Sequence, residues 1–66
     1  MSMLKVIEVL AESNKSWEDA AQNAIDTAGK SVRNIKSIYI KNLEAVVANN
    51  KITHYRVNAN ITFEVS

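Results

Sequence analysis

The sequence predicts an α+β fold with the element order β-α-β-β, in which a three-stranded antiparallel sheet is wrapped on one amphipathic helix. Three observations predict it. Residues 52–65 alternate between apolar and polar side chains, apolar residues recur every three or four positions over 17–32, and two β-prone segments flank that stretch. A period of two is typical of a half-buried strand, whereas a spacing of three to four is typical of a helix.

The first strand is predicted over 4–10, where the sequence LKVIEVL is rich in valine, isoleucine and leucine. Residues 11–14 interrupt this pattern with polar side chains. Ser13 is one candidate for the N-cap of the helix, because a serine hydroxyl accepts a hydrogen bond from a backbone N–H of the first turn. Ser16 is the other candidate, since Ser16 and Asp19 have the spacing of a capping box.

The apolar stripe predicts one amphipathic helix of about four to five turns. Acidic side chains come early in this stretch and Lys30 and Arg33 come late, which suits the helix dipole. Gly29, the only glycine, weakens the last turn. Most of the stripe is alanine, so the helix can approach the sheet closely. Its members are Trp17, Ala20, Ala21, Ala24, Ile25, Ala28 and Val32.

Two further strands are predicted over 35–47 and 52–65, joined by a turn at 48–51. Asn49 and Asn50 in that turn tolerate the left-handed conformations that a hairpin requires. The alternation of the last strand separates its two faces. One face carries Tyr55, Val57, Ala59, Ile61, Phe63 and Val65, and the other carries His54, Arg56, Asn58, Asn60, Thr62 and Glu64.

Composition limits the classes of function. The 66 residues predict a single domain, residues 1–66, without cysteine and with one histidine, so disulfides, thiol catalysis and histidine-rich metal sites are excluded. A net charge of +1 gives little attraction for nucleic acid or an anionic membrane. No apolar run approaches the roughly 20 residues of a membrane span, and the N-terminus has no signal-peptide pattern. We therefore expect a cytoplasmic protein with neither a nucleic-acid nor a membrane partner.

Self-association is expected from the size of the domain. A chain this short buries only about 60% of the surface that its unfolded form exposes, and small folds compensate with disulfides, metals or oligomerisation. One helix covers one sheet face, so the other face and both edges stay open. Exposed edges favour aggregation unless other copies cover them in a closed symmetric assembly. A monomer with a hydrated sheet face is the alternative.

The sequence contains no recognisable catalytic constellation. There is no G-x-S-x-G motif, no glycine-rich phosphate loop and no H-E-x-x-H motif. We therefore expect a protein that is not an enzyme. A small-molecule enzyme with a site shared between subunits is the least favoured alternative, because no nucleophile–base pair is visible.

Candidate binding residues lie on the polar face of the last strand. Arg56 is either an ion-pair partner at an interface or a clamp for an anion, and His54 can pair with a neighbour or bind a ligand. Tyr39 and Tyr55 can stack on a ligand. Carboxylates can supply oxygens to a calcium-like ion, above all where symmetry brings copies together. The candidates for that role are Glu8, Glu12, Glu44 and Glu64.

Three stretches resemble one known family over almost the full length. They are residues 5–9 with Glu12-Ser13, the alanine-rich run from Ser16 to Ala28, and residues 55–65. In their order and spacing they resemble the dodecins, which are small flavin-binding proteins with a β-α-β-β subunit. The resemblance implies twelve identical subunits, a homo-dodecamer, in a hollow shell of cubic symmetry. It also implies small-molecule ligand sites at the two-fold axes.

Two positions depart from the flavin-binding members of that family. In those members a strand-two tryptophan stacks on the flavin and a strand-three glutamine hydrogen-bonds its ring; the resemblance places these positions at Ser37 and Arg56. Serine has no π-face, and arginine only donates hydrogen bonds. The cofactor that the family implies is a flavin (riboflavin, FMN or FAD), and its binding is expected to be weak or lost here.

Relatives that lack the stacking tryptophan include proteins described as calcium-binding, and the sequence looks closer to these. The leading hypothesis is thus a dodecin-like dodecamer for binding and storage. The alternative is an assembly protein that binds ions such as calcium, or anions, with Arg56, His54 and Glu64 as candidate contacts.

Overall fold

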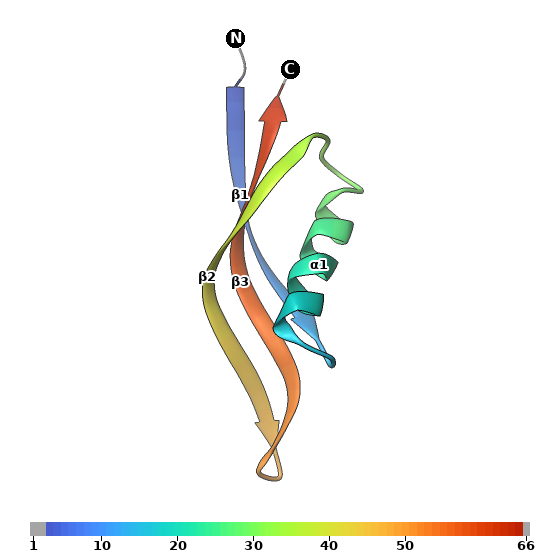
Figure 1. Ribbon diagram of the computed structural model, residues 1–66, viewed down its shortest axis with the longest axis vertical. Coiled ribbons are helices and arrows are strands. Elements are labelled where there is room, and N and C mark those ends of the chain that lie inside the picture. The colour runs from blue at the N-terminus through green and yellow to red at the C-terminus, as the bar shows by residue number, and fades with distance from the viewer. Residues whose placement is uncertain (1–2, 66) are drawn as a thin grey trace.

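The computed structural model describes residues 3–65, and these form four elements in the predicted order. Strand β1 spans Met3–Ser13, helix α1 spans Trp17–Ala28, strand β2 spans Ile35–Ala48 and strand β3 spans Lys51–Val65. The strands form one antiparallel sheet in the order β1-β3-β2, so β3 is central. The sheet is long and twisted, and α1 lies against one of its faces (Figure 1). The predicted fold class is confirmed.

The core lies between the alanine stripe of α1 and the apolar row of β3. Val57, Ala59 and Ile61 are at most 1% exposed, and Ala20, Ala24 and Ala28 face them from the helix. Alanine allows close approach of helix and sheet, and the apolar surface that is removed from water stabilises the fold by about 25 cal/mol per Å². Around Ala24, Ala28 and Ile61, the half-buried side chains that complete the packing are Ile7, Val9, Ala11, Ile25, Val32, Ile35 and Ile38.

The beginning of α1 decides between the two candidate caps. Ser16 is the N-cap, because its hydroxyl accepts a hydrogen bond from the backbone N–H of Asp19 at 3.0 Å. Ser13 is buried at the end of β1 and has a different role. Its hydroxyl donates to Asp19 Oδ2 at 2.6 Å and accepts from the N–H of Lys15 at 2.9 Å. The two serines together hold the sharp connection from strand to helix.

The helix ends earlier than the apolar spacing predicts. It has 12 residues and ends at Ala28, whereas the stripe continues to Val32. After Gly29 the backbone hydrogen bonds are mixed in range: Lys30 N–H donates to Thr27 and Ser31 N–H to Ala28, three residues back, while Val32 N–H also donates to Ala28, four residues back. A tightened last turn of this kind is common at helix ends. Val32 still packs on the core, so the period persists in a turn that is no longer helical.

The strands are longer than predicted at several ends. β1 continues to Ser13 because Glu12 and Ser13 pair with Arg56 and Tyr55 of β3. The turn between β2 and β3 is confirmed, with Asn49 and Asn50 in left-handed conformations at φ 54° and 63°. A two-residue turn with positive φ at both positions matches the twist of the flanking strands. Among residues 3–65, no helix is long and apolar enough to cross a membrane.

Candidate functional site

The sheet face opposite α1 carries the predicted site residues. In an antiparallel sheet, residues directly opposite one another project from the same face. His54, Arg56, Asn58, Asn60, Thr62 and Glu64 of β3 therefore share this face with their partners on the flanking strands. We call it the helix-free face. Its members from β1 and β2 include Leu4, Val6, Glu8, Leu10, Glu12, Ser37, Tyr39, Asn42, Glu44 and Val46.

Arg56 connects all three strands at one end of this face. Its Nε donates to Glu12 Oε1 of β1 at 2.8 Å, and its Nη1 lies 3.7 Å from Glu44 Oε1 of β2. The hydrogen bond from Arg56 lowers the pKa of Glu12, and the same bond raises the pKa of Arg56. Both ion pairs lie within one chain, whereas the sequence predicted an ion pair at an interface or a clamp for an anion, so these two roles stay predictions. With two carboxylates beside one guanidinium, this cluster carries a net charge of −1 and does not favour an anion.

His54 and Ser37 lie apart from each other on the helix-free face. His54 is two residues from Arg56 on β3, and its Nδ1 is 3.1 Å from Thr53 Oγ1. Ser37 pairs with Thr62, six residues further along β3 from Arg56. At about 3.3 Å per residue, Ser37 and Arg56 are therefore separated by roughly 20 Å within one chain. A small ligand that touches both positions needs Ser37 from one copy and Arg56 from another.

The remaining carboxylates of this face are paired with lysines. Glu8 Oε2 accepts a hydrogen bond from Lys41 Nζ at 2.8 Å, and that bond is the main reason why the pKa of Glu8 is lowered. Glu64 Oε1 lies 3.5 Å from Lys36 Nζ. Within residues 3–65, no group of three acidic, histidine or cysteine side chains is close enough to hold a metal ion. A calcium ion at these carboxylates would therefore need oxygen atoms from more than one copy.

A shallow pocket of about 390 Å³ lies beside Arg56. Its lining comes from Leu10, Asn42, Leu43, Glu44, Arg56 and Asn58. Asn58 Oδ1 is buried without a hydrogen-bond partner, the one such side-chain atom among the described residues. Sequence reasoning placed Asn58 on the polar face but did not single it out. The feature that could have identified Asn58 is its position as an uncharged polar residue in the middle of the longest predicted strand.

The aromatic residues are distributed unequally between the two sheet faces. The Trp17 ring packs edge-on against Tyr55 with centroids 4.8 Å apart, and its Nε1 donates to the backbone oxygen of Glu44 at 3.0 Å. Trp17 therefore joins α1 to the sheet on the covered side. Tyr39 is 67% exposed and pairs with Asn60 on the helix-free face. Among the described residues it is the one tyrosine, tryptophan or phenylalanine on that face.

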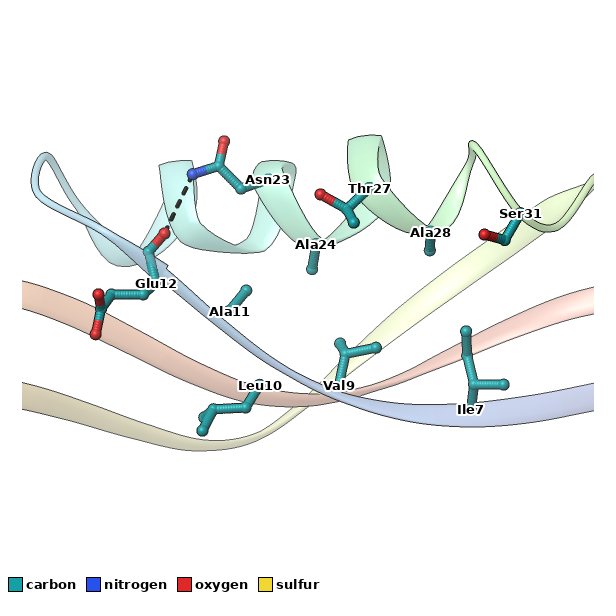
Figure 2. Close-up of a pocket in the computed structure, with 10 residues that line it drawn as sticks. All are labelled: Ile7, Val9, Leu10, Ala11, Glu12, Asn23, Ala24, Thr27, Ala28 and Ser31. Atoms are coloured by element: carbon teal, nitrogen blue, oxygen red, sulfur yellow. Dashed lines mark hydrogen bonds between the residues drawn. The ribbon is translucent and has the colours of Figure 1, made fainter.

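A second depression, the α1–β1 groove, lies on the other side of the sheet (Figure 2). It has a volume of about 540 Å³. Its lining residues are Ile7, Val9, Leu10, Ala11 and Glu12 from β1, Asn23, Ala24, Thr27 and Ala28 from α1, and Ser31. The side chains of Leu10 and Glu12 point away from the helix (Figure 2). Asn23 Nδ2 closes one end by donating to the backbone oxygen of Glu12 at 3.3 Å (Figure 2). The groove is mainly apolar because small alanines leave space between helix and strand.

Comparison with known proteins gives a consistent result for sequence and structure. The family model described as dodecin matches residues 3–66. Over 66 residues the chain is 38% identical to the calcium dodecin of Mycobacterium tuberculosis, covering 98% of this chain and 92% of that protein. The crystal structure of that calcium dodecin, described as having a novel calcium-binding site, matches with a TM-score of 0.83 at 31% identity, covering 97% of this chain and 91% of that one.

Other dodecin structures match the fold at lower sequence identity. A point variant of the Thermus thermophilus dodecin has a TM-score of 0.94 at 21% identity, covering 100% of this chain and 98% of that chain. The dodecin of Streptomyces coelicolor has a TM-score of 0.94 at 18% identity, covering 98% and 93%. At these identities the likeness extends to the backbone and not to the choice of ligand.

Proposed function

Because this chain belongs to the dodecin family, we propose that it is a non-enzymatic, homo-dodecameric binding and storage protein whose inter-subunit sites take a divalent cation such as calcium in preference to a flavin. The observation that carries the proposal is the ion pairing of Arg56 within the chain. Its guanidinium is engaged by Glu12 and Glu44, at the position where flavin-binding members are expected to have a glutamine.

The residues present do not fit a flavin ring. Ser37 offers no π-face for stacking, and Arg56 cannot accept a hydrogen bond from a flavin N–H. The helix-free face retains Tyr39 as an exposed aromatic ring, which supports weak residual flavin binding as the second candidate function. Since Ser37 and Arg56 are far apart within a chain, a flavin that touches both would occupy a site shared between copies, and the resemblance to the family implies that such sites lie at two-fold axes.

Carboxylate oxygens are the ligands that calcium prefers in proteins. Four glutamates share the helix-free face, and Glu44 and Glu8 are the most exposed of those in ion pairs, with side chains 63% and 56% accessible. Two copies that meet on this face bring twice the number of carboxylates together. The M. tuberculosis relative, whose name includes calcium, supports the same ligand class.

Two titrations test the proposal on the purified protein. Calcium chloride is expected to raise the melting temperature of the chelator-treated protein in a saturable way, because a ligand that binds only the folded state stabilises it. Riboflavin and FMN are expected to leave the melting temperature unchanged. A Glu44→Gln variant should lose the calcium response, whereas Glu18→Gln, which is on α1, should retain it. A yellow protein that quenches flavin fluorescence with a definite stoichiometry would contradict the proposed ligand.

A further inference from the structure

Asn58 carries a buried oxygen atom, Oδ1, that has no hydrogen-bond partner. The residue lies on the central strand, opposite Leu10 of β1 and Asn42 of β2, so it is in the middle of the helix-free face. An unpaired buried acceptor costs free energy, and few folded proteins keep one without a reason. A bound cation satisfies such an atom, because amide oxygens are among the ligands that calcium accepts.

Two exposed glutamates lie on either side of Asn58. The pKa of Glu8, on β1, is lowered mainly by its hydrogen bond to Lys41 and to a smaller extent by a hydrogen bond from the Asn58 amide. Glu44, on β2, lines the same pocket as Asn58. Asn58 therefore lies between carboxylates of the two edge strands, where its oxygen can complete a set of cation ligands.

The orientation of the Asn58 amide explains why its oxygen is unpaired. A carboxylate only accepts hydrogen bonds, so the amide faces Glu8 with its nitrogen and leaves Oδ1 without a partner. A cation at Glu8 reverses this preference, because it attracts the oxygen and repels the N–H groups. Half a turn about the bond to the amide exchanges the two atoms, so the change needs no movement of the strand.

Lys41 holds the position of a cation beside Glu8. Its Nζ lies 2.8 Å from Glu8 Oε2, so its side chain crosses the central strand next to Asn58 to reach β1. Lys41 is the extra residue of β2 between Ile40 and Asn42, which frees it from the regular pairing. The side chains of this ion pair are 39% and 56% exposed, and ion pairs in contact with water are weak. A divalent cation can therefore displace the lysine.

We propose that Asn58 Oδ1 and the Glu8 carboxylate bind the same divalent cation, and that Lys41 is an internal competitor that occupies Glu8 until the cation displaces it. The inference rests on the proposed cation-binding function and specifies two ligands and one residue that regulates their affinity. Calcium takes about six to eight oxygen ligands, so Glu44, water or a second copy supplies the others. Because Lys41 has to leave, the site fills only when the concentration of the cation is high enough to compete with it.

Calcium titrations followed by melting temperature test the role of Lys41. Lys41→Met removes the charge, and we expect the calcium concentration at the half-maximal rise to fall by roughly tenfold, because a unit charge about 6 Å from a divalent ion in water changes its binding constant by about this factor. Lys41→Arg keeps the charge and should respond like the natural protein. The matched control is Lys36→Met, which removes the same charge from the same strand beside Glu64 and should leave the midpoint unchanged.

Asn58→Leu tests the amide oxygen, since leucine has nearly the same shape and no polar atom. After treatment with a chelator we expect this variant to melt at the same temperature as the natural protein or higher, because no unpaired acceptor remains. It should lose most of the calcium response. Asn60→Leu makes the same change two residues further along the helix-free face, outside the pocket that Asn58 lines, and should retain the response.

The outcomes separate this site from the general function. If Lys41→Met and Asn58→Leu respond to calcium as the natural protein does, the cation binds elsewhere, and the proposed cation function stands without this site. Equal midpoints for Lys41→Met and Lys36→Met would overturn the competition by Lys41, and this comparison holds even if Asn58→Leu does not fold. If neither the natural protein nor Lys41→Met responds to millimolar calcium, the site and the cation function fail together.

Discussion

Introducing a tryptophan and a glutamine at two positions should create flavin affinity. The variant is Ser37→Trp with Arg56→Gln. Ser37 is an exposed residue opposite Thr62, so an indole there projects from the helix-free face without displacing core atoms. Glutamine at 56 provides the hydrogen-bond acceptor that arginine lacks and removes the positive charge beside Glu12 and Glu44.

The magnitude follows from the stacking geometry. Each favourable aromatic pair contributes about 0.5–1.5 kcal/mol beyond the burial of area, and a ring held between two copies meets two indole faces. The expected gain is therefore about 1–3 kcal/mol, which is roughly a 5- to 150-fold decrease in the Kd for riboflavin. Quenching of riboflavin fluorescence during titration with the protein measures this change directly.

The matched control is Ser37→Leu with Arg56→Gln, which adds apolar surface without a π-system. We expect this control to quench little more than the natural protein. Equal affinity of the leucine and tryptophan variants would refute the stacking argument. No gain in the tryptophan variant, in a preparation whose native mass is unchanged, would show that Ser37 does not lie at the ligand site.

Three further outcomes are expected from the structure. Ile61→Ala, which truncates a fully buried side chain, should lower the free energy of unfolding by about 2–5 kcal/mol in urea titrations, and a loss under 1 kcal/mol would contradict the core described above. Ser16→Ala removes the N-cap bond and should cost about 1 kcal/mol in the same assay, with an unchanged stability arguing against that cap. The pKa values of Glu8 and Glu12 are lowered in the folded state, so the stability that they contribute is complete above pH 4.5 and is lost as the pH falls towards their folded values. Melting temperatures between pH 7 and pH 3 should therefore fall less steeply for Arg56→Gln than for the natural protein, and parallel curves would contradict this coupling.

The sequence pattern was sufficient for the fold where periodicity and burial agree. Residues 52–65 alternate because β3 is the central strand and has one face on the helix, and the buried row of Val57, Ala59 and Ile61 follows directly. The same reasoning predicted a helix that is longer than the one observed, which ends at Ala28. Val32 continues the apolar spacing and still contacts the core, but it does so from a turn after Gly29. Apolar periodicity reports which side chains are buried and does not report where backbone hydrogen bonds change.

The site was predicted less completely, because the sequence does not show which residues of neighbouring strands stand opposite one another. Arg56 could be placed on the polar face from alternation, but its partners depend on which residues of β1 and β2 stand opposite it. Two irregularities between β2 and β3 each shift that pairing by one residue: Lys41 is the extra residue of β2 between Ile40 and Asn42, and Thr53 is the extra residue of β3 opposite Val46 and Val47. The pairs of Arg56 with Glu12 and Glu44, and the distance that separates it from Ser37, thus required the structure.

Trp17, the first residue of the apolar stripe, anchors the helix to the sheet within one chain. Its ring contacts Tyr55 and its indole N–H bonds to β2, so it fixes the first turn of α1 against the sheet. Sequence spacing predicted that Trp17 lies on the apolar face of the helix. It could not predict the hydrogen bond from the indole N–H to the backbone oxygen of Glu44. That bond depends on how far α1 is displaced along the sheet.

Self-association is the claim on which the inter-subunit site depends. Native mass spectrometry of the purified protein at micromolar concentration tests it most directly. We expect a single dominant particle with twelve times the 7.4 kDa mass of the chain. A folded species of 7.4 kDa under the same conditions would contradict both the shared site and the cation proposal.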